Sequence, residues 1–244
     1  MLAAVNKAYV FDTIDEMQIS QSHFAYSGDN IDALVKYLST ERLAAYFSMA
    51  KRSMEGAIKL YERNTELSEA LYGVVQGLEV TLRNAVHIAI SGTQGHDWYD
   101  TFPLLRTEQS SVAEARKKIE DRLETITPGR VVAELNFGFW VRLFSAEYDK
   151  SLWGTDLRKI VPIRLNRRAV YERLKSIKTL QNRIAHHNRI IGKKQTVAEL
   201  YLETVEAIGW FSPKMQLWVE TTNCVQARLT RKFSPVGASP KPTV

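Results

Sequence analysis

The sequence predicts an all-α fold, and three observations support this prediction. Apolar residues make up 45% of the chain and charged residues 25%, which is typical of a folded globular protein. Seven prolines are spread thinly over 244 residues, so long stretches are free to form helices. Several of these stretches repeat apolar residues every three or four positions, and none alternates as a β-strand does. A single cysteine, Cys224, excludes an internal disulfide framework and a cysteine-based zinc site.

The first half of the chain predicts a short extension followed by helices of increasing length. Residues 1–30 show no clean periodicity and end in turn and cap residues, so we interpret them as a loosely structured extension. Helical spacing then predicts helices at 31–38, at 43–47 and at 54–61. The longest apolar stripe begins at Leu67 and ends near Gly92, and it predicts a central helix of the bundle.

The middle of the chain predicts three further elements. A polar helix is expected at 108–126, with Leu123 on its apolar face. Pro128 favours a new helix because proline is well accommodated at the first helical position. A shorter element follows at 153–161.

The last third predicts the most basic helix and the end of the fold. This basic helix is expected at 166–190, where Gly192 ends it, and a second helix at 197–208, where Gly209 ends it. A last helix is expected at 213–229, which makes residues 31–230 a single domain. The proline-containing tail at 231–244 is predicted to be disordered.

Positive charge is concentrated in one segment. Residues 158–194 contain 12 of the 33 Lys and Arg residues but only one of the 27 acidic residues, a net charge of +11. The rest of the chain has a net charge of −5, although the whole protein carries +6. A cluster of this kind attracts polyanions, most often nucleic acid. The alternative is a solvated face whose charges pair with acids elsewhere in the fold.

The polar side of the basic helix carries groups suited to RNA cleavage. On a helix the side opposite the apolar stripe carries Lys175, Lys178, Asn182, His186 and Arg189. Neighbouring positive charge favours a neutral imidazole, which can act as a general base, and an arginine can hold a phosphate oxygen. Attack of a 2′-hydroxyl on its own phosphodiester needs a base, an acid and a positive clamp, but no metal. The alternative is that His186 and His187 only favour the helix C-terminus electrostatically.

A second polar line lies on the central helix. Glu79, Arg83 and His87 follow one another at four-residue intervals, and Asn84 lies beside them. Such a line is commonly a solvated face with a salt bridge. If the two helices pack side by side, however, their polar lines can face one cleft. Adjacent histidines on a helix point about 100° apart and cannot share one ion, so we expect no metal site.

Several motifs occur together in a fixed order along the chain. They are Glu41-Arg42-Leu43, Leu60 to Asn64, Leu67-Ser68, Leu78 to His87, Thr127 to Trp140 and Leu180 to His187. In this order they resemble the Abi-like proteins of bacterial abortive-infection defence, and the resemblance covers about residues 35–220. It implies a helical bundle of the HEPN type with additional N- and C-terminal helices.

The resemblance also implies an activity and a site. Many HEPN domains are metal-independent endoribonucleases that act as dimers, with an Arg, a following polar residue and a His at a site shared by two copies. By position, Asn182 matches the polar residue and His186 the catalytic His, whereas Gln181 stands where the family has Arg. Arg183 together with His187, or alternatively Arg83 or Arg189, is then expected to supply the missing positive charge.

We therefore expect a cytoplasmic endoribonuclease toxin or phage-defence effector that needs no cofactor. Its expected partners are RNA, a second copy of the chain and an antitoxin made of protein or RNA. The expected catalytic residues are Gln181, Asn182, Arg183, His186, His187, Arg83 and Glu79. The expected RNA-binding residues are Lys175, Lys178, Arg189, Asn84 and His87.

Two alternatives of a different class remain. In the first, the chain is an RNA-binding or protein-interaction module without turnover, because Gln181 replaces the arginine. In the second, it is a nucleotide- or DNA-binding regulator. An aromatic platform for stacking bases would favour binding, and the sequence shows no clear one. We expect Trp140, Trp153, Trp210 and Trp218 to lie in the core.

Overall fold

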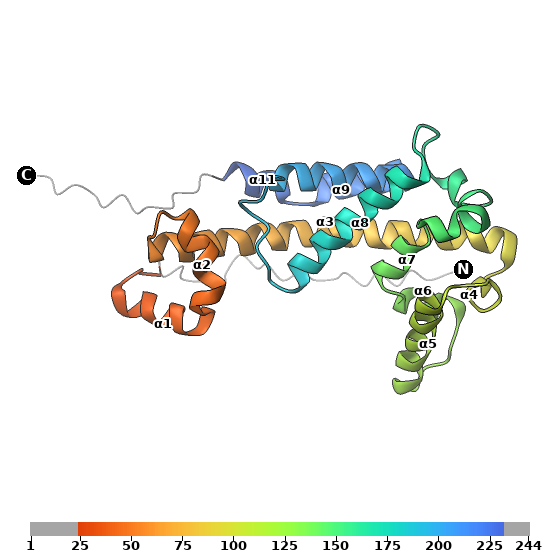
Figure 1. The fold of residues 1–244 in the computed structure, drawn as a ribbon, viewed down its shortest axis with the longest axis horizontal. Coiled ribbons are helices and arrows are strands. Elements are labelled where there is room, and N and C mark those ends of the chain that lie inside the picture. The colour runs from red at the N-terminus through yellow and green to blue at the C-terminus, as the bar shows by residue number, and fades with distance from the viewer. Residues whose placement is uncertain (1–23, 232–244) are drawn as a thin grey trace, which may run out of the picture.

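The computed structural model describes residues 24–231, and within this range every regular element is helical. The architecture is built around one long helix, α3, which runs from Met54 to Gln94 without interruption (Figure 1). Buried apolar residues recur along this helix from Leu67 to Ile90. The predicted all-α class is therefore confirmed.

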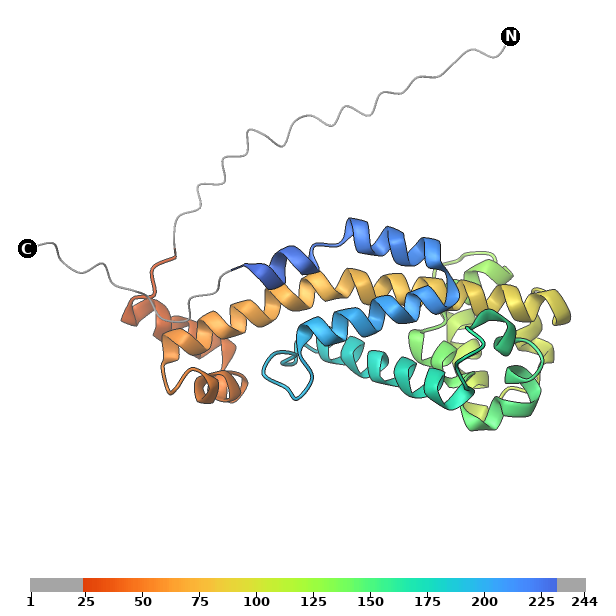
Figure 2. The same cartoon turned by 90° about the horizontal axis from the view of Figure 1, so that it is seen from above.

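The C-terminal helices line two sides of α3. Helix α8 (Arg167–Ala185) and helix α9 (Val197–Phe211) lie along one side, and α10 (Pro213–Thr222) and α11 (Val225–Thr230) lie along the other (Figure 2). Helix α8 runs back along the middle of α3 in the opposite direction, so its last residues lie beside the N-terminal half of α3 (Figure 1). The C-terminal end of the basic helix is thereby brought to the N-terminal half of α3.

Shorter elements cover the two ends of the bundle. Helices α1 (Gly28–Leu38) and α2 (Thr40–Met49) pack at the start of α3. Ser39 caps α2 through its hydroxyl, which accepts the Arg42 N–H. The elements at the far end are α4 (Trp98–Thr101), α5 (Arg106–Asp121), α6 (Pro128–Glu134), α7 (Phe137–Arg142), η2 (Ala146–Tyr148), η3 (Asp149–Trp153) and η4 (Leu157–Ile160).

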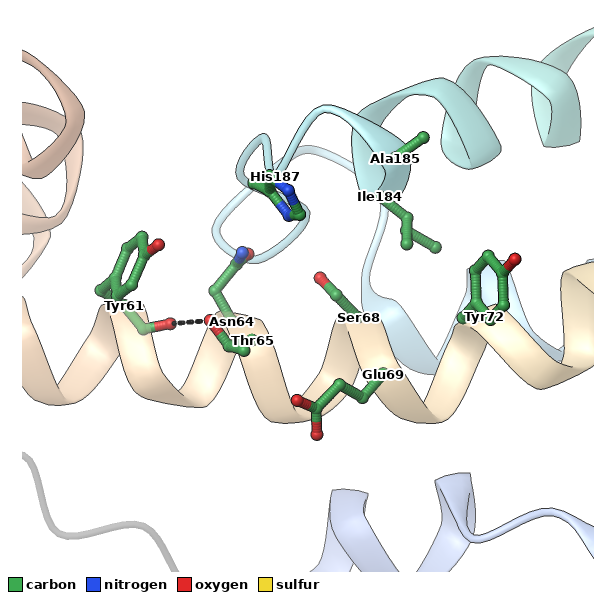
Figure 3. Close-up of a pocket in the computed structure, with 9 residues that line it drawn as sticks. All are labelled: Tyr61, Asn64, Thr65, Ser68, Glu69, Tyr72, Ile184, Ala185 and His187. Carbon is green, nitrogen blue, oxygen red and sulfur yellow. Dashed lines mark hydrogen bonds between the residues drawn. The ribbon is translucent and has the colours of Figure 1, made fainter. Parts of the chain in front are cut away.

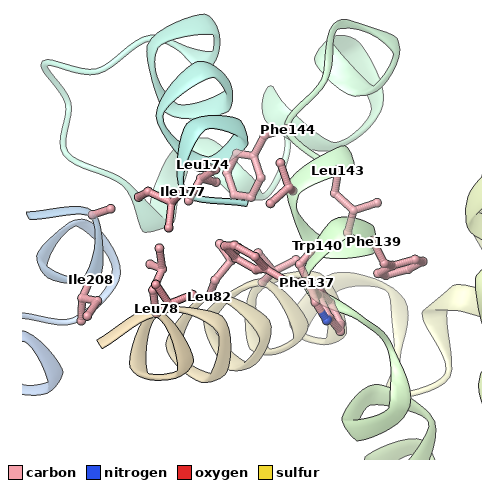
Figure 4. Packing of buried hydrophobic residues seen from close by; sticks show 14 of the residues in the cluster. Leu78, Leu82, Phe137, Phe139, Trp140, Leu143, Phe144, Leu174, Ile177 and Ile208 are labelled. Carbon is pink, nitrogen blue, oxygen red and sulfur yellow. The ribbon is translucent and has the colours of Figure 1, made fainter. Parts of the chain in front are cut away.

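The main core lies where α3, α7 and α8 meet. Leu78 and Leu82 of α3 face Trp140 of α7 and Leu174 of α8, and all four side chains are fully buried (Figure 4). Complete burial of side chains this large contributes on the order of 2 kcal/mol each to folding. Trp140 and Trp210 are buried as expected, but Trp218 is 56% exposed on α10, so its expected place in the core is wrong.

Two predicted helices are in fact one. Helices were expected at 54–61 and from 67, but α3 continues through the polar residues between them. Arg63 and Asn64 in this stretch are buried and bond to distant backbone: Arg63 donates to the Arg228 carbonyl, and Asn64 accepts from Ile190. Tertiary partners therefore replace the missing apolar residues in this part of the helix.

Two predicted helix ends are also wrong. Helix α5 ends at Asp121 rather than at 126, because Leu123 adopts a left-handed conformation (φ 56°) and is 96% exposed. Helix α9 continues through Gly209 to Phe211 and ends before Pro213. A side chain at Gly209 would collide with Gln216 of α10, so this glycine allows a close helix contact rather than ending a helix.

The helices near the two ends of the predicted domain differ from the predicted elements in their bounds, and the division into an extension, one domain and a tail stays a prediction. Helix α1 begins at Gly28, inside the predicted extension, and the expected final helix at 213–229 is divided at Asn223 into α10 and α11. Residues 1–23 and 232–244, which include nearly all of the predicted tail, lie outside the described residues. None of the helices between residues 24 and 231 combines the length and hydropathy needed to cross a bilayer.

The contact between α3 and α10 can be tested with two glycines of the same helix. A Cβ at Gly77 would lie 2.8 Å from Cγ2 of Val219, whereas a Cβ at exposed Gly73 would meet nothing within 4 Å. Gly73→Ala should therefore stabilise the protein by about 0.5–1 kcal/mol, because alanine favours a helix. Gly77→Ala should destabilise it by about 1 kcal/mol or more through overpacking. Urea unfolding measures both changes, and equal stabilisation by the two variants would contradict this packing.

Candidate nucleic-acid site at the end of helix α8

The two adjacent histidines lie at the end of α8 and not within it. The helix was expected to reach Ile190, but it ends at Ala185, and His186 is its C-cap. His187 adopts a left-handed conformation with φ 54°, and the Asn188 N–H returns to the Arg183 carbonyl at 2.7 Å. This pattern ends a helix, usually with glycine at the left-handed position. Both histidine side chains are consequently exposed on a turn.

Buried and charged groups from other helices hold this turn in place. Asn64 of α3 is only 3% exposed, and its Oδ1 accepts the N–H groups of Ile190 at 2.8 Å and Ile191 at 3.4 Å. Arg42 of α2 donates from Nη1 to the His187 carbonyl at 3.0 Å. We call residues 186–191 the histidine loop. It is fixed to both neighbouring helices, although it has no regular structure.

Two surface depressions meet at His187. The first, which we call the tyrosine groove, has a volume of about 540 Å³ and lies between α3 and the end of α8 (Figure 3). It is lined by Tyr61, Asn64, Thr65, Ser68, Glu69, Tyr72, Ile184, Ala185 and His187. The second, which we call the cationic depression, has a volume of about 420 Å³. It is lined by Ser39, Glu41, Arg42, Ala45, Tyr46, His187, Asn188 and Arg189.

Arg42 and Arg189 give the cationic depression its charge. Within residues 24–231 their guanidinium groups contact a backbone carbonyl and the Met49 sulfur rather than carboxylates. Glu41 also lines the depression, but hydrogen bonds from backbone N–H and from hydroxyls at the start of α2 lower the pKa of its carboxyl. This carboxylate therefore favours its charged form and offsets part of the positive charge of the depression, but within residues 24–231 it forms no salt bridge with either guanidinium group.

Gln181 takes part in helix packing and not in the two depressions. Its Nε2 donates to Oε2 of Glu79 at 2.7 Å, and both side chains are half-buried between α8 and α3. Burial raises the pKa of the Glu79 carboxyl, while the hydrogen bond from Gln181, the charge of Arg83 and the Phe137 N–H act in the opposite direction. The structure therefore brings Glu79 and Gln181 together, but as a contact between helices.

The polar lines of α3 and α8 do not form one cleft, and that expectation is wrong for a single chain. Arg83 donates to the Ala133 carbonyl at 3.2 Å, and Nδ1 of His87 accepts the indole N–H of Trp98 at 3.1 Å. His87 follows Asn64 by 23 residues, which places it about 35 Å farther along α3. Arg83, exposed Asn84 and His87 thus lie far from the histidine loop, because α8 crosses α3 instead of following it.

The other predicted residues lie at different distances from the loop. Lys175 and Asn182 are exposed on α8, whereas half-buried Lys178 reaches Gly138 of α7. Arg183 faces a third depression of about 570 Å³ together with Lys193 and Lys194. Arg189 was expected on the helix face, but it lies on the histidine loop because α8 ends early.

Sequence reasoning did not find three side chains of this site. Arg42 lies 145 residues before His187, and the tyrosines Tyr61 and Tyr72 have helical spacing that suits a core stripe equally well. No local signal marks these residues, since their importance depends on how α2 and α3 pack against the loop. Within the described range no three His, Cys, Asp or Glu side chains gather as a metal site would require.

We expect Asn64→Ala to release the histidine loop. The substitution removes the Asn64 oxygen that accepts the buried Ile190 N–H, and an unsatisfied buried donor costs about 1–3 kcal/mol. Urea unfolding should show this loss, and hydrogen exchange should show faster exchange at Ile190 and Ile191. Thr65→Ala, at an exposed neighbour whose hydroxyl bonds only within α3, is the control and should change neither quantity. Unchanged exchange in Asn64→Ala would show that Asn64 does not hold the loop.

We expect His87 to make stability fall in mild acid. Burial and nearby His96 lower its pKa, so the unfolded chain binds a proton near pH 6.5 before the folded chain does. Stability should therefore decrease as the pH falls from 7 to 5. His87→Gln cannot titrate, so its stability should decrease less, whereas His96→Gln removes one of the two causes of the lowered pKa and should give an intermediate decrease. Urea unfolding at both pH values measures the differences; identical slopes for the native chain and His87→Gln would refute this assignment.

Comparison with known proteins is consistent with the sequence resemblance. A family model described as Abi-like protein matches residues 30–192, which is more than half of the chain. The match extends from α1 through the histidine loop and excludes α9, α10 and α11. No curated protein and no solved structure matches the chain. The chain therefore belongs to the Abi-like protein family.

Proposed function

We propose that this protein is a defence endoribonuclease that cleaves RNA at the histidine loop by internal attack of the 2′-hydroxyl. One observation carries the proposal: His187 lines the cationic depression together with Arg42 and Arg189, and His186, which is also exposed, precedes it on the same turn. A base, an acid and a positive clamp are the three groups that this reaction needs. The family match also ends just after this loop, so the loop lies within the shared part of the chain.

The reaction follows from the chemistry of two imidazoles. A neutral His186 takes the proton of the 2′-hydroxyl, and the 2′-oxygen forms a bond to phosphorus. The bond between phosphorus and the 5′-oxygen breaks, and a protonated His187 gives its proton to this leaving oxygen. The products are a 2′,3′-cyclic phosphate and a free 5′-hydroxyl. Arg42 and Arg189 stabilise the negative charge that develops on the phosphoryl oxygens.

Because Gln181 stands where the family has Arg, other residues must contact the phosphate in this proposal. Gln181 lies against Glu79, so it orients α8 rather than contacting the phosphate. Asn182 is exposed on the last turn of α8 and can donate to the RNA backbone. Lys175 on the same exposed face extends the positive surface along which a longer RNA can lie.

The proposal includes assembly of two copies. HEPN-type nucleases, which the sequence resembles, place their sites at a dimer interface, and the histidine loop is open on its outer side. Sedimentation should then give twice the 27.8 kDa mass of one chain. An antitoxin would act by covering the same loop.

A second function is favoured by one observation. Gln181 carries no charge and is already bonded to Glu79, so a clamp at the family's arginine position is missing. A chain that keeps the fold and the positive surface without this clamp would bind RNA and not cleave it. This alternative is an RNA-binding module of the same family.

Incubation of the purified chain with end-labelled RNA in EDTA tests both functions. We expect cleavage to 2′,3′-cyclic phosphate ends, and we expect His186→Ala and His187→Ala each to reduce the rate by about 100-fold or more, because general acid–base groups contribute this much. His96→Ala is the matched control, since His96 is exposed at the opposite end of α3.

The outcomes separate the two functions. Cleavage that is lost in both loop variants and kept in His96→Ala supports the nuclease. Binding without cleavage, converted to cleavage by Gln181→Arg, would favour the binding module. Cleavage that persists in both loop variants would place the catalytic groups elsewhere.

A further inference from the structure

We propose that the tyrosine groove binds one nucleobase of the RNA, immediately beside the phosphate held in the cationic depression. This inference rests on the proposed function in that it takes RNA as the ligand. It adds a subsite that distinguishes a base from a bare sugar-phosphate backbone. Tyr72 and Ser68 form this subsite, and His187 separates it from the cationic depression.

The groove is formed by one face of α3 and the end of α8. Tyr61, Ser68 and Tyr72 are separated by seven and four residues, so they share one face of the helix. Figure 3 shows the Ser68 hydroxyl directed toward the groove between the two tyrosines, with His187 above it. Ile184 lies opposite Tyr72 and closes the other wall.

The walls suit an aromatic ring with polar edges. Tyr72 is 55% exposed, although its position in the middle of α3 would allow burial. Tyr61 is held in place by an edge-to-face contact with buried Tyr46, whose ring centroid lies 5.7 Å away. An exposed tyrosine in a preformed groove offers a face on which any base can stack. The Ser68 hydroxyl offers a hydrogen bond to its edge.

The size and charge of the surroundings select a nucleotide as the occupant. A volume of about 540 Å³ falls within the range of roughly 300–1,000 Å³ that small-molecule pockets occupy. His187 is the wall between this groove and the cationic depression that contains Arg42 and Arg189. A base on one side of His187 and its phosphate on the other reproduce the arrangement of a single nucleotide. In segment 158–194, Arg164, Arg167 and Arg173 pair with carboxylates. Within the described residues Lys175, Arg183, Lys193 and Lys194 form no such pair, and their charge extends this match to a polynucleotide.

The test measures binding separately from cleavage. Fluorescence anisotropy with a short 2′-O-methyl RNA, which cannot undergo internal attack, gives affinities for the native chain and for three variants. We expect Tyr72→Ala to weaken binding about tenfold, since stacking on an aromatic ring contributes to this extent. Tyr72→Phe keeps the ring and should bind within a factor of two. Tyr37→Ala is the matched control, because Tyr37 is 81% exposed on α1 and outside the groove.

A second RNA locates the base. Replacing one nucleotide at a time with an abasic sugar should reduce affinity for the native chain at one position only. The same replacement should have no effect on Tyr72→Ala, which has already lost the contact. Equal affinity for a fully abasic strand and for the intact RNA would overturn the subsite, because binding would then be electrostatic alone.

The remaining outcomes distinguish the subsite from the nuclease. Base-dependent binding without cleavage of ordinary RNA would refute the nuclease and support the subsite. Cleavage of ordinary RNA with unchanged affinity in Tyr72→Ala would support the nuclease and overturn the subsite. No binding of RNA by the native chain, with capture of a peptide in the groove instead, would overturn both.

Discussion

The uninterrupted course of α3 is the constraint on which the rest of this structure depends. A helix of 41 residues extends about 60 Å, so groups placed along it are held at fixed distances from one another. Asn64 near its beginning holds the histidine loop, Glu79 in its middle contacts Gln181, and His87 near its end contacts Trp98. The polar side chains of this one helix thereby serve three separate tasks, and only the first of them reaches the candidate site.

The periodicity of the sequence predicted the helices well, because an apolar stripe must face a core wherever the chain is folded. It failed at helix ends, where a tertiary contact decides the outcome. Gly192 suggested that α8 continues to residue 190, yet His187 takes the left-handed position that glycine usually occupies. Asn64 accepts the N–H of Ile190, and this contact from 126 residues away makes the early end possible. No local pattern contains that information.

The candidate site was predictable in part for the same reason. Both histidines belong to a short contiguous motif, so the sequence places them together without knowledge of the fold. Arg42 and Tyr72 come from α2 and α3, and their contribution becomes visible only when the end of α8 is seen between those helices. Gln181 shows the opposite error: its position in the motif suggested a contact with phosphate, whereas its amide lies on a half-buried carboxylate.

The hydrogen bond between Gln181 and Glu79 contributes to the packing of α8 on α3 and adds no positive charge to the candidate site. The half-buried Glu79 carboxylate accepts the Phe137 N–H and lies near Arg83. The neutral amide of Gln181 supplies one more hydrogen bond and adds no second buried cation. The proposed function therefore requires positive charge for a phosphate from residues outside this contact. Arg42 and Arg189 meet that requirement because neither is paired with a carboxylate in the described part of the chain.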